Sequence, residues 1–190
     1  QIFISAYGED ETVGATADNT GCVYVFNYDG SSWYQSQRLI ASDKMDGDKF
    51  GSSLCVSNNI LLIGAPEELI DLSSPSLSLP NRGQVYIFNY DSSAKTWSQD
   101  TSNILQSALH NSIEGANNYF GYSVGFSNNK IIVGAYKTGT NKGRIYEFYY
   151  NNSIKYIGSV IDNNSTKYIG PIIDGDADND LFGQTLKVHN

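Results

Sequence analysis

The chain contains two near-copies of one pattern: residues 50–65, FGSSLCVSNNILLIGA, and residues 120–135, FGYSVGFSNNKIIVGA. Each copy opens with Phe-Gly, runs through an apolar segment, turns at Ser-Asn-Asn and closes a second apolar segment with Gly-Ala. A further Phe-Gly, at Phe182 and Gly183, opens LFGQTLKVHN. Such internal repetition indicates an array in which each repeat is one supersecondary unit that packs against its neighbours.

A second pattern recurs between these copies. Residues 21–28 (GCVYVFNY), 83–90 (GQVYIFNY) and 143–150 (GRIYEFYY) match one another, and a Trp follows the first two at Trp33 and Trp97. Each repeat therefore has four short strands: one after Phe-Gly, one ending in Gly-Ala, one of the Val-Tyr-Ile-Phe type and one after the Trp. Four-stranded units that repeat in this way predict an all-β fold of antiparallel β-propeller-type blades.

Local composition supports short strands joined by polar turns. Aromatic residues make up 13% of the chain, and 14 of them are Tyr. Residues 57–59 and 127–129, both Ser-Asn-Asn, are tight-turn sequences because Asn tolerates positive φ. The strands that follow, residues 60–63 and 131–133, are nearly continuous apolar runs, which is typical of sheets buried on both faces.

The division into blades follows from the repeats. Residues 186–190 match residues 54–58, and residues 1–6 match residues 59–65 with one residue fewer. We therefore expect three repeats that together form one propeller-like unit. Blade one is split between residues 1–45 and residues 182–190. Blade two covers residues 46–115 and blade three covers residues 116–181.

Two segments depart from the repeat. Residues 67–82 form a long insertion in blade two that includes LSSPSLSLP, and we expect it to be exposed to solvent. Residues 153–162 recur as residues 165–174 in blade three. One of these two copies should form the outer strand of the blade, and the sequence leaves open which copy does so.

The two patterns resemble the FG-GAP repeat, the blade of integrin α-like propellers. The resemblance rests on residues 41–43 (Ala-Ser-Asp), 47–51 (Gly-Asp-Lys-Phe-Gly), 64–66 (Gly-Ala-Pro) and the strand at 83–88, and it extends over nearly the whole chain. Tyr136 replaces the Pro of Gly-Ala-Pro in the third blade. The resemblance implies an extracellular or cell-surface propeller module used in adhesion or surface assembly.

A loop of alternating carboxylates precedes Phe182: Asp174, Asp176, Asp178 and Asp180. This pattern suits a hard cation such as Ca²⁺, which prefers oxygen ligands. The alternative is a solvated acidic turn in which Asp180, like Asp48, accepts hydrogen bonds from local backbone amides. Both interpretations remain open from the sequence.

The sequence contains no convincing catalytic constellation. Residues 121–125 fit the GxSxG pattern of a nucleophile elbow, which needs a strand–turn–helix context. Here Ser123 falls within a predicted strand, and the chain has only two histidines, His110 and His189. We therefore predict that the protein is not an enzyme and has no cofactor other than the possible Ca²⁺.

The sequence contains candidate N-glycosylation sites and two cysteines that could form a disulfide. Asn151, Asn163 and Asn164 fit the N-glycosylation acceptor rule, which matters if the protein is secreted. The two cysteines, Cys22 and Cys55, are either small buried residues or a disulfide between neighbouring repeats.

The charge and hydropathy of the chain argue against nucleic-acid binding and against a membrane-spanning segment. The net charge is −8 without a Lys/Arg cluster, which argues against nucleic acid and anionic membranes as partners. No apolar run approaches the ~18 residues of a membrane span.

Incomplete burial points to assembly. An apolar blade face of roughly 400 Å² left in water costs about 10 kcal/mol at ~25 cal/mol per Å², which is comparable with the whole stability of a domain, ~5–15 kcal/mol. We therefore expect copies of the chain, or further repeats of a longer chain, to cover the open faces, and such contacts can build a filament. The alternative is a ligand-binding domain of a cell-surface receptor for a carbohydrate or a protein. The aromatic side chains could serve such a site, although packing between blades explains their regular positions.

Overall fold

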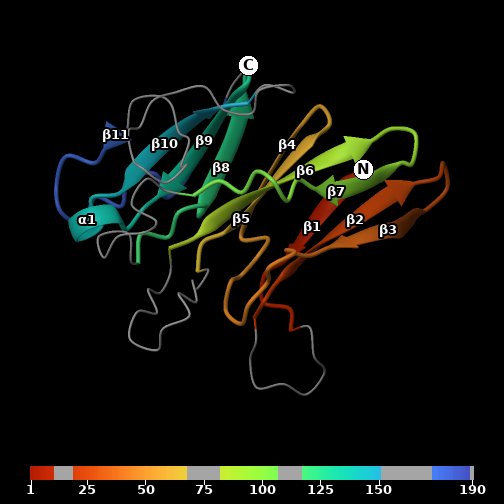
Figure 1. The fold of residues 1–190 in the computed structure, drawn as a ribbon, viewed down its shortest axis with the longest axis horizontal. Helices are drawn as coiled ribbons and strands as arrows, with labels where there is room; N and C mark the ends of the chain where they lie inside the picture. The colour runs from red at the N-terminus through yellow and green to blue at the C-terminus, as the bar shows by residue number, and fades with distance from the viewer. Residues whose placement is uncertain (11–18, 68–81, 107–116, 151–172, 189–190) are drawn as a thin grey trace.

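Three antiparallel sheets make up the fold of the computed structural model, which describes residues 1–10, 19–67, 82–106, 117–150 and 173–188. The sheets lie side by side, with blade two in the middle (Figure 1). The all-β prediction is confirmed, and the one helix of the described part is a single turn, α1 (Thr138–Asn141). In the described residues, no helix is long and apolar enough to cross a membrane.

Within each blade, strands adjacent in sequence are adjacent in the sheet. Blade one contains three strands: β1 (Ile2–Ala6), β2 (Cys22–Tyr28) and β3 (Trp33–Leu39). Blade two contains four: β4 (Ser53–Ser57), β5 (Ile60–Ala65), β6 (Gln84–Asp91) and β7 (Thr96–Gln99). Blade three also contains four: β8 (Ser123–Ser127), β9 (Lys130–Ala135), β10 (Arg144–Tyr149) and β11 (Ile173–Asp174).

Tight turns join the first two strands of blades two and three. Asn58 has φ +53°, and Asn128 and Asn129 have φ +49° and +61°. Asn adopts this left-handed conformation at low cost, so each Ser-Asn-Asn sequence closes its hairpin as predicted. The register that results places Leu54 opposite Ile63 in blade two.

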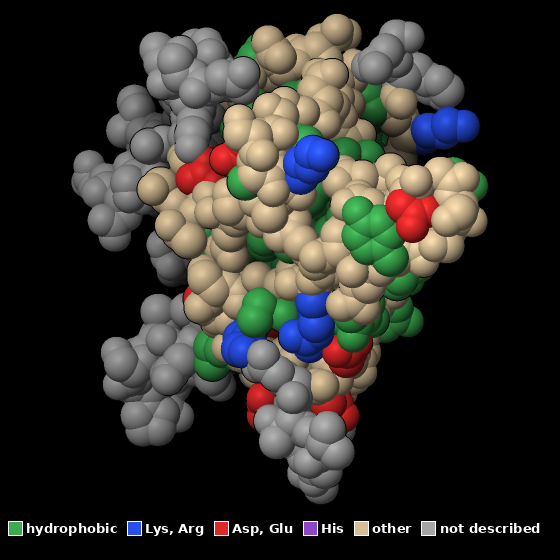
Figure 2. Space-filling model, turned by 90° about the vertical axis from the view of Figure 1, so that its right-hand side faces the viewer, with side chains coloured by type: hydrophobic (Ala, Val, Ile, Leu, Met, Phe, Trp, Pro, Cys, Tyr) green, Lys and Arg blue, Asp and Glu red, His purple; other side chains and the backbone are tan. Residues whose placement is uncertain are grey.

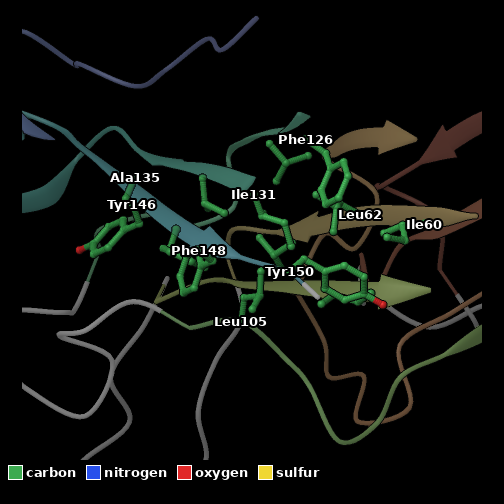
Figure 3. Close-up of a cluster of buried hydrophobic side chains, with 14 residues drawn as sticks. Ile60, Leu62, Leu105, Phe126, Ile131, Ala135, Tyr146, Phe148 and Tyr150 are labelled. Carbon is green, nitrogen blue, oxygen red and sulfur yellow. The ribbon is translucent and has the colours of Figure 1, made fainter. Parts of the chain in front are cut away.

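Successive side chains of β5 point into two different cores. Ile60 and Leu62 belong to the cluster between blades two and three, which we call the 2–3 junction and which Figure 3 shows. Leu61 and Ile63 belong to the cluster between blades one and two, the 1–2 junction. Strand side chains alternate between faces, and both faces of this sheet are covered, so every residue of β5 is buried.

The array is not closed within the described residues. Blade one has three strands, and its β1 pairs with β2 alone. Residues 182–188 contain no strand, and the ideal Cβ of Gly125 would lie 2.3 Å from Val188 Cγ2, which places this segment beside blade three. Its pairing with β1 in a split blade therefore stays a prediction of the sequence.

The structure identifies the outer strand of blade three and the state of the two cysteines. The outer strand of blade three, β11, comes from the end of the second duplicated copy and pairs with Arg144 and Ile145 of β10. The first copy and the insertion at 68–81 lie outside the described residues. Both cysteines are free, Cys22 buried and Cys55 partly buried, so the structure contains no Cys22–Cys55 disulfide.

Candidate functional site

Each junction between blades is organised around the Phe of a Phe-Gly pair. The ring of Phe50 contacts Tyr86 and Phe88 of its own blade edge to face, with centroids 5.3 and 6.0 Å apart. Phe120 repeats this arrangement with Tyr146 and Phe148 at 5.2 and 6.0 Å. Both Phe rings have 0% exposed surface. Edge-to-face aromatic packing adds to the free energy gained from burial, so these rings anchor the stacking of the blades.

The glycine after each Phe lies against the preceding blade. The hydroxyl of Ser53 donates to the carbonyl oxygen of Gly121 at 2.7 Å. A side chain at Gly64 could not be accommodated, because its Cβ would lie 2.0 Å from that same oxygen. The next blade repeats both features: Ser123 donates to the Gly183 oxygen at 2.7 Å, and a Cβ at Gly134 would lie 2.0 Å from it.

Phe182 and Gly183 begin a third junction of the same kind. The backbone N–H of Phe182 donates to the Lys142 oxygen at 3.0 Å, as that of Phe50 donates to the Thr20 oxygen at 2.9 Å. The ring of Phe182, however, is only half-buried, and it has no aromatic partner in the described part of the chain. One half of a junction is therefore present on the outer side of blade three.

The outer side of blade one presents the matching half. Tyr24 and Phe26 are the repeat equivalents of the Tyr and Phe residues that contact Phe50 and Phe120. Their cross-strand neighbours Ile4 and Ile2 are 48% and 41% exposed. Figure 2, viewed from this side of the molecule, shows hydrophobic side chains at the surface among charged ones. This face has the composition of a blade face that stacks on another blade.

A polar cluster lies at the edge of that face. The Tyr24 hydroxyl donates to the Glu9 carboxylate at 2.7 Å, and Arg38 forms an ion pair with it at 3.0 Å. The Cys22 thiol also donates to Glu9, at 3.3 Å. The hydrogen bond from Tyr24 lowers the pKa of Glu9; partial burial opposes this, and the bonds from Cys22 and Arg38 reinforce it. Burial in turn raises the pKa of the Cys22 thiol.

The four carboxylates of the acidic loop do not gather around one point. Arg144 holds Asp174 through both carboxylate oxygens, and Lys142 lies 3.9 Å from Asp178. Asp180 accepts from the Ala177 N–H at 2.8 Å, and Asp176 is exposed. Throughout the described ranges, no group of three or more His, Cys, Asp or Glu side chains could hold a metal ion. The four carboxylates therefore do not share one site in this arrangement, and calcium stays a prediction of the sequence.

The alternative proposed for Asp48 and Asp180 agrees with the geometry. Asp48 accepts a hydrogen bond from the Met45 N–H at 2.6 Å, as Asp180 does from Ala177 three residues before it. Each carboxylate thereby closes the turn that leads into a Phe-Gly pair. These two aspartates therefore position the loops at which one blade begins to pack on another.

Of the remaining candidate residues, the structure describes Ser123 but not the glycosylation candidates or the histidines. Ser123 lies within β8, as predicted, and its hydroxyl donates to the Gly183 oxygen. The glycosylation candidates Asn151, Asn163 and Asn164 lie outside the described residues, as do His110 and His189. The Ser-to-Gly hydrogen bonds were not predicted, although Ser at matching positions 53 and 123 was a usable signal.

The repeated segments of the chain match a known protein family. A family model described as FG-GAP repeat matches residues 33–88 and 106–148, which together make up about half of the chain. The two matches contain the Phe-Gly pairs of blades two and three, at Phe50 and Phe120. A search of curated proteins finds no match.

Proposed function

The chain belongs to the FG-GAP repeat family, and we propose on that basis that it is a non-enzymatic extracellular structural or adhesive module. In this proposal its blades assemble with copies of the chain, or with further repeats of a longer chain, to give a propeller ring or a filament. FG-GAP domains mediate protein interactions, and the absence of a long apolar helix from the described residues is compatible with this role.

One observation carries the proposal. Two junctions within the chain use the same Phe, Tyr and Phe contacts, while Phe182 and the Tyr24–Phe26 pair are the two separate halves of a third. A half-buried aromatic ring on one side and exposed isoleucines on the other leave apolar surface in water, which costs free energy until both are covered. A second copy offers to each half the surface that the internal junctions already use.

The repeat also gives the register of the strand that would complete blade one. In blade two, Leu54 of β4 lies opposite Ile63 of β5. Leu186 is the repeat equivalent of Leu54, and Ile4 is the equivalent of Ile63. A neighbouring copy that adds residues 185–188 beside β1 would therefore place its Leu186 opposite Ile4, by main-chain pairing at an open sheet edge.

Mass measurement of the full chain over a range of concentrations tests the proposal. We expect light scattering after size exclusion to show species larger than 20.9 kDa that dissociate on dilution. Phe182→Ala and Ile4→Lys should each reduce the association, since they remove an apolar contact and add a charge at the two halves of the third junction. Met45→Ala, at an exposed loop residue that belongs to neither half, is the control.

A monomeric chain would contradict the proposal. A compact 20.9 kDa monomer at every concentration, with the same mass for wild type and both variants, would contradict assembly with copies of this chain. Far-UV circular dichroism of each variant checks that the blades remain folded, so that a loss of association cannot be confused with unfolding.

A further inference from the structure

A pocket of about 390 Å³ opens between blades two and three, at the end where the Ser-Asn-Asn turns lie. Asn58 and Asn59 of the β4–β5 turn, Asn129 of the β8–β9 turn and Asn89 of β6 line its polar side. The apolar side belongs to the 2–3 junction, where Figure 3 shows Phe126, Tyr150 and Ile60 on the same side of the cluster.

The corresponding place in the 1–2 junction is filled by a side chain of the protein. Trp97 is 5% exposed there; its ring centroid lies 5.0 Å from that of Tyr90 and 5.4 Å from that of Phe3. The indole N–H donates to the side chain of Gln1 at 3.3 Å. This aromatic ring is thus held between two blades by one polar and two aromatic contacts.

The repeat equivalents of the groups around Trp97 line the pocket. Tyr150 is equivalent to Tyr90, and Ile60 is equivalent to Gln1. Both tryptophans of the chain, Trp33 and Trp97, precede blade three, and the described residues that line the pocket include no equivalent of Trp97. Among the described residues, the pocket therefore has room for a ring-shaped group at a position where the preceding junction holds one of its own.

The chemistry of the lining selects the class of ligand. A carboxamide both donates and accepts hydrogen bonds, as a sugar hydroxyl does. Four asparagine carboxamides line the pocket. The Tyr150 hydroxyl donates to Asn89 Oδ1 at 3.0 Å, which fixes the carboxamide of Asn89 at the pocket wall. The described lining residues include no charged side chain, so an ionic ligand would lose its hydration without gaining a counter-ion.

We propose that this pocket binds one neutral saccharide unit. The apolar face of the sugar ring lies against the aromatic side chains of Tyr150 and Phe126, and its hydroxyls exchange hydrogen bonds with the asparagine carboxamides. Pockets with an apolar wall and a few fixed polar groups are the usual form of small-molecule sites in proteins. The site belongs to one chain and is independent of assembly with other copies.

Saturation-transfer NMR and calorimetry on the full chain test the site, with the methyl glycosides of glucose, galactose, mannose and N-acetylglucosamine as probes. We expect at least one of them to bind. Asn89→Ala should weaken that binding tenfold or more, and Asn129→Gly should do the same while keeping the left-handed backbone at φ +61°. Asn27→Ala is the matched control, because Asn27 is the equivalent of Asn89 in blade one and lies outside the pocket.

Three results would overturn the proposal. These are the absence of binding by all four glycosides, binding that persists unchanged in Asn89→Ala and Asn129→Gly, and a preference for the methyl glycoside of sialic acid over the neutral probes. Circular dichroism shows which variants are folded. If Asn89→Ala does not fold, Asn129→Gly and Tyr150→Phe, which keeps the ring and removes the hydroxyl, decide the result.

Discussion

The hydroxyl of Ser53 in blade two donates a 2.7 Å hydrogen bond to the main-chain oxygen of Gly121 in blade three. The same bond joins Ser123 to Gly183, and Ser5 likewise bonds to the Gly51 oxygen. A side-chain donor on one blade thus satisfies a carbonyl of the next blade at every Phe-Gly step of the described chain. This contact sets how closely two blades approach.

Replacement of Gly64 by Ala should separate blades two and three. Its Cβ would lie 2.0 Å from the Gly121 oxygen and 2.4 Å from Ser53 Oγ, so backbone has to move. We expect a loss of about 1–3 kcal/mol in the free energy of unfolding, the usual cost of overpacking. Guanidinium unfolding measures it. Gly8→Ala is the control, since its Cβ would have an ordinary 3.6 Å contact, and equal losses in both variants would contradict the close approach.

The three Phe residues of the Phe-Gly pairs should differ in their contribution to stability. Phe120 is fully buried against Tyr146 and Phe148, so Phe120→Ala should cost about 3–5 kcal/mol in a chemical denaturation experiment. Phe182 is only half-buried, and in dilute solution Phe182→Ala should cost clearly less. A loss as large for Phe182 as for Phe120 would mean that the ring of Phe182 is already covered within one chain.

Stability should fall in acid partly through Glu9. The pKa of Glu9 is lowered in the folded chain by the Tyr24 hydrogen bond, so its ionised form stabilises the fold above its ordinary pKa of 4.5. That contribution is lost as the pH falls through the lowered value. The free energy of unfolding of Glu9→Gln should therefore depend less on pH below about pH 4.5 than that of wild type. Identical slopes for the two proteins would show that the cluster does not hold Glu9 ionised.

The register proposed for the blade that spans two copies can be trapped by a disulfide. A chain with both Leu186→Cys and Ile4→Cys should form covalent dimers and higher species under mild oxidation, because these residues would face each other across neighbouring strands. Each single variant alone controls for reaction of the buried Cys22 and the partly buried Cys55. Ladders of equal intensity from Lys187→Cys with Ile4→Cys would contradict this register, since that pair is offset by one residue.

The acidic loop should stabilise the chain without calcium. Asp180→Ala removes the acceptor for the Ala177 N–H and should cost about 1 kcal/mol, as the loss of a capping side chain does. The loss should be equal in millimolar CaCl₂ and in EDTA, as followed by thermal unfolding. A midpoint that rises with CaCl₂ in wild type, and no longer rises in Asp176→Asn, would instead establish the calcium site that the sequence predicts.

The sequence by itself determined the local structure of this protein. Asn in both Ser-Asn-Asn turns allows positive φ, and the nearly continuous apolar run of β5 fits a sheet with two covered faces. The repeated sequence patterns predicted the order of strands in each blade and the four strands of blades two and three, because these signals are local and the hydrogen-bonded neighbours are adjacent in the chain.

Only the tertiary structure decided what depends on two blades at once. Both faces of β5 are equally apolar, so the sequence could not assign Leu62 to one junction and Leu61 to the other. The engagement of Asp174 by Arg144 joins segments far apart in the chain, which the spacing of the carboxylates alone does not show. The asparagine-lined pocket exists because two sheets meet at a fixed distance, and distances between distant segments are set by packing rather than by local sequence.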